Sequence, residues 1–292
     1  MADSGDNGQI KNDIPDKIIR KVSIFPSMPQ AVIKLRALLT EEDVSSDEIV
    51  GILRHDPGLA ANVLRLANSA YFGIPNKVST LKHAVTLLGV ERFAQIAVTA
   101  SMNKVMDRAV DGYGLSPGEL WLHSIAVSST AEALAKNKKL AGHHDFFSPA
   151  LLHDLGKLVL GEFVKKELPE IERLVAKGVP IAIAEKEVLG TDHAEIGALI
   201  LSKWRLPGDL INAVRWHHYP EGVEHSNLHP EIVYLANLLC QSNGDREPAE
   251  GELFLPYSSV LDRLSINYEQ YRAFAETARS WMKKLSDTLT FD

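Results

Sequence analysis

Apolar residues recur three and four positions apart along most of the chain, which is the spacing of one face of an α-helix. The pattern covers 29–39, 45–56, 58–72, 80–89, 90–107, 117–137, 149–167, 169–177, 180–189, 193–204, 207–218, 229–243 and 267–288. No stretch of the sequence alternates convincingly as a strand would, and no unit repeats at a fixed period. The pattern therefore predicts an all-α fold.

Two polar segments rich in glycine and proline, 106–119 and 241–256, divide this helical pattern. Each could be a linker between subdomains or a surface loop within one domain. We expect one continuous helical body with four parts. These are a flexible tail and first helix at 1–23, an N-terminal helical subdomain at 24–106, a histidine-rich subdomain at 107–240, and a linker with a C-terminal helical pair at 241–292.

Composition narrows the class of protein without identifying it. The 292 residues are 45% hydrophobic and carry a formal net charge of −7, which argues against binding nucleic acid through a basic surface. With Cys240 as the single cysteine, an intramolecular disulfide or a thiolate metal cluster is excluded. We find neither a signal peptide nor a long apolar run, so we expect a cytoplasmic protein that does not enter the membrane.

The segment SPALLHDLGKLVL (148–160) places three ionisable side chains inside a strongly apolar pattern. Ser148 is the expected N-cap, with a proline at the first helical position. On a continuous helix, Lys157 would lie beside both His153 and Asp154. Because an unpaired buried charge costs several kcal/mol, roughly 3–5 when a partner is lost, these groups need partners from elsewhere in the chain.

Histidines at five positions lie in similarly apolar, helix-like surroundings: His123, His153, His193, His217 and His218. A single histidine of this kind is usually a hydrogen-bonded core residue, but five on several segments indicate a shared site. Imidazole and carboxylate ligands suit iron, manganese or zinc. The other histidines are expected on the solvated surface: His55, His83, His143, His144, His225 and His229.

Lys157 has two interpretations at this stage. It could bind an anionic ligand oxygen or hold Asp154 in place, or it could extend from the helix edge into solvent. The Gly-Lys pair at 156–157 is not a phosphate-binding loop, because the glycine-rich spacing before it is missing. Tyr71 and Phe72, with IPNKVST (74–80), could belong to a binding surface or to a packed helix end followed by a turn.

The order of these residues resembles the HD superfamily of metal-dependent phosphohydrolases, and LLHDLGK (151–157) is especially similar to its central motif. Residues 25–93 resemble the opening of the HDOD domain. That second match covers Asp56-Pro57, LRLANSAYFG (64–73) and AVTLLG (84–89). Together the two resemblances extend over residues 24–240, which predicts an HDOD-specific helical subdomain packed against an HD-like helical bundle.

The resemblance also implies a set of metal ligands. His123, His153 and Asp154 would bind one ion, and Asp154 would bridge to a second ion held by His193, His217 and His218. The last ligand of the superfamily is an aspartate, and Asn237 stands there in this sequence. The glycine-tyrosine-proline signature of the cyclic-dinucleotide phosphodiesterase branch is absent from HHYPEGVEH (217–225).

Three functions follow from this resemblance. The first is a bacterial signalling module that regulates by binding a partner protein or a nucleotide-type ligand, with a mononuclear or binuclear metal site. The second is a metal-dependent phosphohydrolase in which Asp154 and Lys157 are the catalytic residues. The third is a sensor that uses an iron pair without turnover. Metal content, followed by comparison of the protein with Asp154→Ala, would separate them; the sequence leaves the oligomeric state open.

Overall fold

The structure is a computed structural model and describes residues 7–38, 44–54, 56–69, 77–223, 228–241 and 254–288. Within these ranges every regular element is a helix, and strand-like pairing is limited to an isolated bridge between Val110 and Leu115. The all-α prediction is confirmed. Within the same ranges, none of the helices combines the length and the hydropathy that crossing a lipid bilayer requires.

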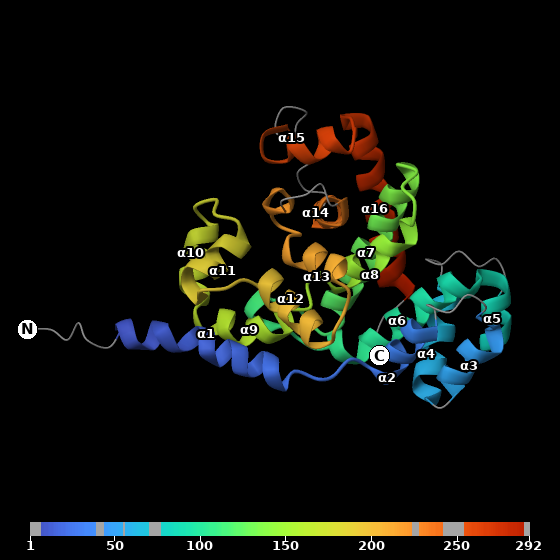
Figure 1. Cartoon of the computed structure of the whole chain (residues 1–292). Coiled ribbons are helices and arrows are strands. Elements are labelled where there is room, and N and C mark those ends of the chain that lie inside the picture. Colours follow the sequence, from blue (N-terminus) through green and yellow to red (C-terminus); the bar gives the residue numbers. More distant parts are fainter. Residues whose placement is uncertain are drawn as a thin grey trace, which may run out of the picture.

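The N-terminal helices separate into one long helix and one compact group. Their bounds are α1 (Asn7–Ile24), α2 (Gln30–Leu38), α3 (Ser46–Arg54), α4 (Pro57–Ala67), α5 (Leu81–Leu88) and α6 (Val90–Met106). Helices α2–α6 gather at one end of the molecule, whereas α1 extends along the histidine-rich part (Figure 1). The part expected to combine a flexible tail with a first helix, 1–23, is thus helical from Asn7 onward.

Local capping explains where two of the short helices begin. The Asp56 side chain accepts a hydrogen bond from the backbone N–H of Leu59 at 2.9 Å, with a proline at the first position of α4. Thr80 caps α5 by accepting from the backbone N–H of His83 at 3.2 Å. The predicted segments 45–56 and 58–72 therefore become two helices separated by a capped turn. Tyr71, Phe72 and residues 74–76 lie outside the described residues.

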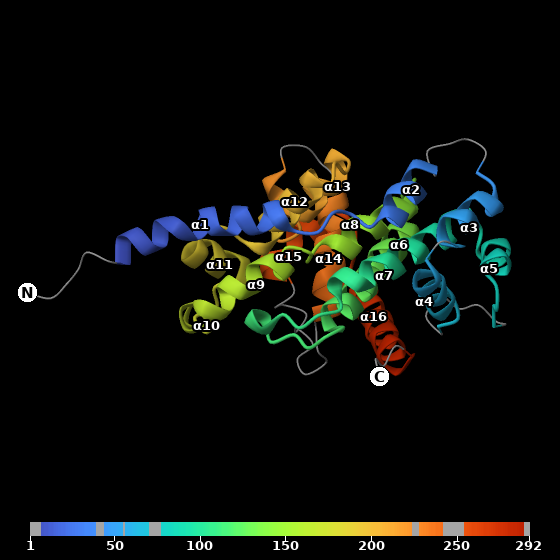
Figure 2. The same ribbon diagram turned by 90° about the horizontal axis from the view of Figure 1, so that it is seen from below.

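The remaining helices form the larger body. They are α7 (Glu119–Asn137), α8 (Phe147–Leu152), α9 (Lys157–Lys166), α10 (Leu168–Val175), α11 (Ile181–Leu189), α12 (His193–Lys203), α13 (Gly208–Arg215), α14 (Leu228–Gln241), α15 (Phe254–Arg263) and α16 (Tyr268–Thr288), with the short 3₁₀ turns η1 (Asp111–Tyr113), η2 (His143–Phe146) and η3 (Pro220–Gly222). Helix α7 is central and contacts α6, α8, α14 and α16 (Figure 2).

Contacts between distant segments join the parts into one body. The Nζ atom of Lys203 in α12 donates to the carbonyl oxygens of Ser23 at 2.6 Å and Phe25 at 2.8 Å, which fixes the end of α1. Ile18 of α1 is fully buried. A continuous apolar core includes residues from α1 through α16, so the chain buries much of its apolar surface in a single cluster.

The segment 149–167 is two helices, so the prediction of one continuous helix there is wrong. Helix α8 ends at Leu152, a turn spans 153–156, and α9 begins at Lys157. Ser148 is not the N-cap either, because α8 already begins at Phe147. This turn packs closely against α12: a Cβ atom at Gly156 would lie 1.9 Å from the carbonyl oxygen of His193 and 2.6 Å from the amide nitrogen of Gly197.

Candidate metal centre

The turn between α8 and α9 lies at the centre of a cluster of side chains. The other members of this cluster come from four further parts of the chain. The cluster contains all seven ligands predicted from the sequence. His153 and Asp154 come from the turn, His123 from α7, His193 from the start of α12, His217 and His218 from the turn that follows α13, and Asn237 from α14.

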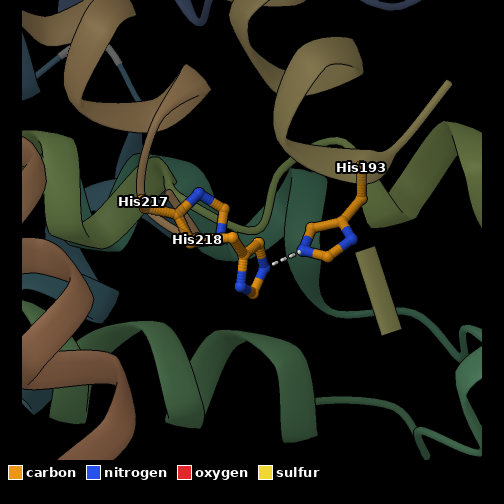
Figure 3. A group of neighbouring side chains, drawn as sticks. All are labelled: His193, His217 and His218. Carbon is orange, nitrogen blue, oxygen red and sulfur yellow. Dashed lines mark hydrogen bonds between the residues drawn. The ribbon is translucent and has the colours of Figure 1, made fainter. Parts of the chain in front are cut away.

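The cluster divides into two groups around a shared carboxylate. We call His193, His217 and His218 the three-histidine group, which is drawn in Figure 3. We call His123, His153 and Asp154 the mixed group. Within each group, one ligand atom from every residue lies within 4.8 Å of the others, which is close enough for a shared metal ion.

Hydrogen bonds to backbone carbonyls fix the tautomer of two of the histidines. The Nδ1 atom of His153 lies 2.7 Å from the carbonyl oxygen of Ala150, and Nδ1 of His217 lies 2.7 Å from that of Val214. A carbonyl oxygen can only accept, so each Nδ1 carries the proton and each neutral ring presents a bare Nε2 lone pair. Both of these Nε2 atoms are buried and have no hydrogen-bond partner among the described residues.

His193 is fixed in the same way, but by a buried carboxylate. Its Nδ1 donates to Oε2 of Glu185 at 2.7 Å, and its backbone N–H donates to the same oxygen at 2.9 Å. Nε2 of His193 is therefore an acceptor, and it lies 2.8 Å from Nε2 of His218 (Figure 3). The edge of the Tyr113 ring packs against the ring of His193, with centroids 6.1 Å apart.

Asp154 is fully buried and faces both groups, one with each carboxylate oxygen. Oδ2 lies 3.2 Å from Nε2 of His153 and 3.7 Å from Nε2 of His123. Oδ1 lies 3.4 Å from Nε2 of His193 and 3.9 Å from Nε2 of His217. This two-sided arrangement is what a carboxylate shared between two adjacent ions requires.

The mixed group differs from the three-histidine group in its remaining contacts. Nε2 of His123 lies 3.1 Å from Oδ1 of Asn237, and the Gln241 side chain donates to the same oxygen at 3.1 Å. Nζ of Lys157 donates to Oδ2 of Asp154 at 2.7 Å and lies 5.4 Å from the centre of the Tyr113 ring. The side chain of Lys157 is only 15% exposed, so it does not extend into solvent. It is instead paired with Asp154 within the cluster.

Burial lowers the pKa of three histidines of the cluster. Desolvation lowers the pKa of His123 to about 4, and nearby His153 and Lys157 act in the same direction. Burial likewise holds the pKa of His217 and of His218 well below the usual range. Burial alone would raise the pKa of Asp154, but nearby His153 and Lys157 outweigh it and hold that pKa well below normal. Neutral imidazoles around an ionised carboxylate are the state that binds metal.

These observations test whether the residues fit a transition-metal ion. In the neutral ring, Nε2 of His153 presents a lone pair 3.2 Å from a carboxylate oxygen, and a cation held between these two acceptors would satisfy both. Oδ1 of Asp154 is also buried without a hydrogen-bond partner among the described residues. Nitrogen and carboxylate donors together suit iron, manganese or zinc. The residues fit such an ion.

Sequence reasoning missed Glu185, which is fully buried and orients His193. The signal was a carboxylate at an apolar-pattern position in IAIAEKEVL (181–189), eight residues before the histidine. Tyr113 was missed as well. It reaches the cluster because Gly112 packs so tightly on α9 that a Cβ there would lie 2.2 Å from the carbonyl oxygen of Gly161.

The histidines expected on the surface have mixed outcomes. His83 is exposed, as expected, and His55 and His225 lie outside the described residues. The expectation is wrong for His143, His144 and His229, which are half-buried.

The half-buried histidines have structural partners. Nδ1 of His144 contacts the Glu132 carboxylate, whose other oxygen pairs with Arg92. The ring of His229 stacks on Phe146 with centroids 4.4 Å apart. These partners hold η2 against α6, α7 and α14, and none of them belongs to the seven-residue cluster.

A cavity of about 400 Å³ opens beside the cluster, and we call it the outer cavity. His218 and Asn237 form part of its wall and link it to the two ligand groups. The rest of the lining comes from α11, η3, α14 and α15: Pro180, Ile181, Tyr219, Pro220, Glu221, Tyr234, Leu238, Gln241, Ser259 and Val260.

Several solved structures have a similar fold. An HDOD domain protein of unknown function from Geobacter sulfurreducens has a TM-score of 0.78 at 22% identity, covering 98% of this chain and 100% of its own. A protein named as a putative phosphohydrolase from Shewanella amazonensis SB2B has a TM-score of 0.74 at 24% identity, covering 94% and 98%. A putative signal transduction protein from Marinobacter aquaeolei VT8 has a TM-score of 0.71 at 19% identity, covering 95% and 65%.

Sequence comparison finds one curated relative and one matching domain family. An uncharacterized protein of Treponema pallidum (strain Nichols) is 26% identical over 267 residues, which is 90% of this chain and 50% of that protein. The chain thus spans about half the length of this curated relative. The model of the HDOD domain matches residues 25–220, which include the N-terminal group of helices and all of the cluster except Asn237. The chain belongs to the HDOD domain family.

Proposed function

We propose that this chain is a cytoplasmic signal-transduction regulatory domain that holds transition-metal ions in its His/Asp cluster. It acts by binding a ligand or a signalling partner protein. The observation that carries the proposal is the fixed tautomer of His153, His193 and His217, each of which presents an Nε2 lone pair near Asp154. Iron or manganese is the expected metal, with zinc as the alternative.

The three-histidine group is the better-equipped half for a first ion. Its imidazoles, with Oδ1 of Asp154, supply four donors, and Glu185 holds one of the rings from behind. In the mixed group Lys157 already neutralises Oδ2 of Asp154, and Asn237 contributes an uncharged oxygen. We therefore propose one tightly bound ion and a second ion that binds more weakly.

A regulatory role is supported by the departures from a hydrolase pattern. Asn237 stands where the resemblance calls for an aspartate, and the phosphodiesterase signature is missing after His218. One relative in fold is named as a putative signal transduction protein.

Phosphoester hydrolysis is a second candidate, favoured by the position of Lys157. Its ammonium group is mostly buried beside Asp154, where it could bind a phosphoryl oxygen. A bound metal ion would add Lewis-acid polarisation of that oxygen and acidify a coordinated water. In this candidate Asp154 and Lys157 are the catalytic residues, and one relative in fold is named as a putative phosphohydrolase.

Metal analysis tests the proposal directly. The protein is purified without chelators, and its iron, manganese and zinc are measured per chain. About one ion per chain is expected, and absence of stoichiometric metal after reloading would contradict the proposal. A phosphodiesterase and phosphatase screen of the protein and of Asp154→Ala then separates regulation from hydrolysis. Turnover that Asp154→Ala abolishes would favour the hydrolase.

An iron-pair sensor is the remaining function. It predicts that iron is the bound metal and that oxidation changes its absorption spectrum without turnover. Zinc or manganese as the native metal would exclude it.

A further inference from the structure

A further set of potential metal ligands lies outside the His/Asp cluster. Glu132 of α7 and the adjacent His143 and His144 of η2 each offer one ligand atom, and these three atoms lie within 4.8 Å of one another. We call these residues the junction group, because contacts with α6 place them where the N-terminal helices meet the larger body. Both histidines were expected on the solvated surface, and their grouping with Glu132 has no part in the predicted ligand set.

The three side chains are already close together. Nδ1 of His144 contacts one oxygen of the Glu132 carboxylate. The ring of His143 packs against that of His144, with centroids 4.0 Å apart. Because a carboxylate oxygen can only accept, Nδ1 of His144 carries the proton in its contact with Glu132. A metal ion can take the place of that proton, since histidine coordinates metal after losing it.

Charged neighbours of the junction group favour a cation over an anion. The second oxygen of Glu132 pairs with Arg92, which also donates to Gln95 at 2.8 Å. Nε2 of His144 lies 3.7 Å from Oε2 of Glu91. In these contacts two carboxylates outnumber one guanidinium. Because Arg92 neutralises part of the charge of Glu132, we expect an ion here to bind less tightly than in the three-histidine group.

The chemistry of the junction group selects the kind of ion. Two imidazoles and one carboxylate, with water in a fourth position, form a ligand set that zinc commonly adopts. Magnesium and calcium prefer oxygen ligands, and manganese binds such a set more weakly than zinc does. The side chain of His144 is 38% exposed and that of Glu132 is 10% exposed, so an ion can reach them from solvent.

We propose that Glu132, His143 and His144 form a second, separate metal site that binds one zinc ion. The ion ties η2 to α7. Since η2 leads directly into α8, and α8 ends at the turn that carries His153 and Asp154, zinc at the junction group steadies the segment that leads to the His/Asp cluster. This inference goes beyond the proposed function and does not depend on metal binding by that cluster.

The affinity test titrates the full chain with zinc, together with His143→Ala and the control His83→Ala. His143 is chosen because its substitution keeps the contact between His144 and Glu132. His83 is an exposed histidine of α5 outside the junction group. Loss of a ligand should cost at least as much as loss of a group that orients one, so we expect one zinc site to weaken by at least about 10-fold in His143→Ala. His83→Ala should keep all its sites, and thermal unfolding checks the fold of both variants.

Two further measurements locate the ion and its effect. Anomalous scattering at the zinc absorption edge, from crystals of the full chain grown with zinc, should show a peak between Glu132, His143 and His144. Hydrogen exchange of residues 143–152 should slow when zinc is added to the full chain, because the ion holds η2 against α7. The same addition should have no such effect on His143→Ala.

The outcomes separate this inference from the proposed function. If the junction group shows no zinc peak, or if His143→Ala binds zinc as tightly at every site as the unsubstituted chain does, the inference is overturned and the His/Asp cluster is unaffected. A peak at the junction group with no ion in the cluster would overturn the proposed function and support the inference. Unchanged exchange of residues 143–152 despite a bound ion would overturn the role of zinc in holding η2.

Discussion

The three-histidine group and the mixed group share Asp154, but they differ in the contacts that orient their imidazoles and in the charges beside their ligand atoms. In the three-histidine group, His193 and His217 are fully buried, and their Nδ1 atoms are held by an acceptor behind each ring. In the mixed group, His123 has a side chain 20% exposed, and its partner is the Asn237 carboxamide. The comparison teaches that a ligand set can be complete by residue count and still unequal in charge and orientation.

Asp154→Ala is the change with the largest expected effect, because it removes the carboxylate that serves both halves. We expect the affinity for metal to fall by at least about 100-fold. Metal content after dialysis and calorimetric titration would measure the loss. Asp111→Ala, which breaks an exposed ion pair with Lys165, is the matched control and should keep its metal. Retention of metal by Asp154→Ala would contradict a metal centre built around this carboxylate.

Single histidine substitutions should separate the two halves. We expect His217→Ala to abolish tight binding of the first ion, because it removes one of the two imidazoles in this group whose tautomer is fixed. His123→Ala should leave that ion in place and affect only the weaker second site. Both affinities are read from a two-site titration with manganese. Equal losses in the two variants would show that the halves are not different in strength.

Glu185→Gln tests the three-histidine group through the residue that orients His193, without removing a predicted metal ligand. The amide oxygen still accepts from Nδ1 of His193, but the negative charge that strengthens this imidazole as a donor is lost. We expect about a 10-fold weaker first ion, at the lower end of effects seen for groups that orient a ligand. Glu231→Gln is the control, since Glu231 is also buried but pairs with Arg263. Metal affinity, with thermal unfolding to check the fold, gives the readout.

Asn237→Asp is the substitution with the smallest expected effect, and it should strengthen metal binding instead of weakening it. A carboxylate there would complete the ligand set of the mixed group, so we expect the second ion to bind on the order of 10-fold more tightly. Gln241→Glu adds the same charge one helical turn away and controls for a general electrostatic effect. If both variants strengthen the second ion equally, the identity of residue 237 does not limit that site.

Much of this arrangement could be predicted because its signals are local. Periodic apolar positions gave the all-α fold and most helices, and histidines on several apolar segments indicated a shared cluster. Glu185 was missed although it stands at an apolar-pattern position, because nothing near it in the sequence identifies a partner for its carboxylate. The chain order does not show that α11 packs against α12.

The break at Gly156 was missed for a related reason. Nothing in LLHDLGKLVL (151–160) departs from a helical pattern, and glycine within a helix is tolerated at a cost of about 1 kcal/mol. At this turn α12 approaches so closely that only a residue without a side chain fits beside His193, a contact that the local sequence does not reveal. Half-buried His144 was mispredicted in the same way, since its partner Glu132, which is itself paired with Arg92, reaches it from α7.

The number and position of metal ions per chain test the central claim most directly. The metal content is measured on protein that has been purified without chelators and reloaded with manganese or iron. The bound ions are then located in crystals by anomalous X-ray scattering. The account predicts one tightly bound ion coordinated by His193, His217 and His218 with Asp154, before any second ion appears. An ion that first occupies the mixed group, or no bound ion at all, would contradict it.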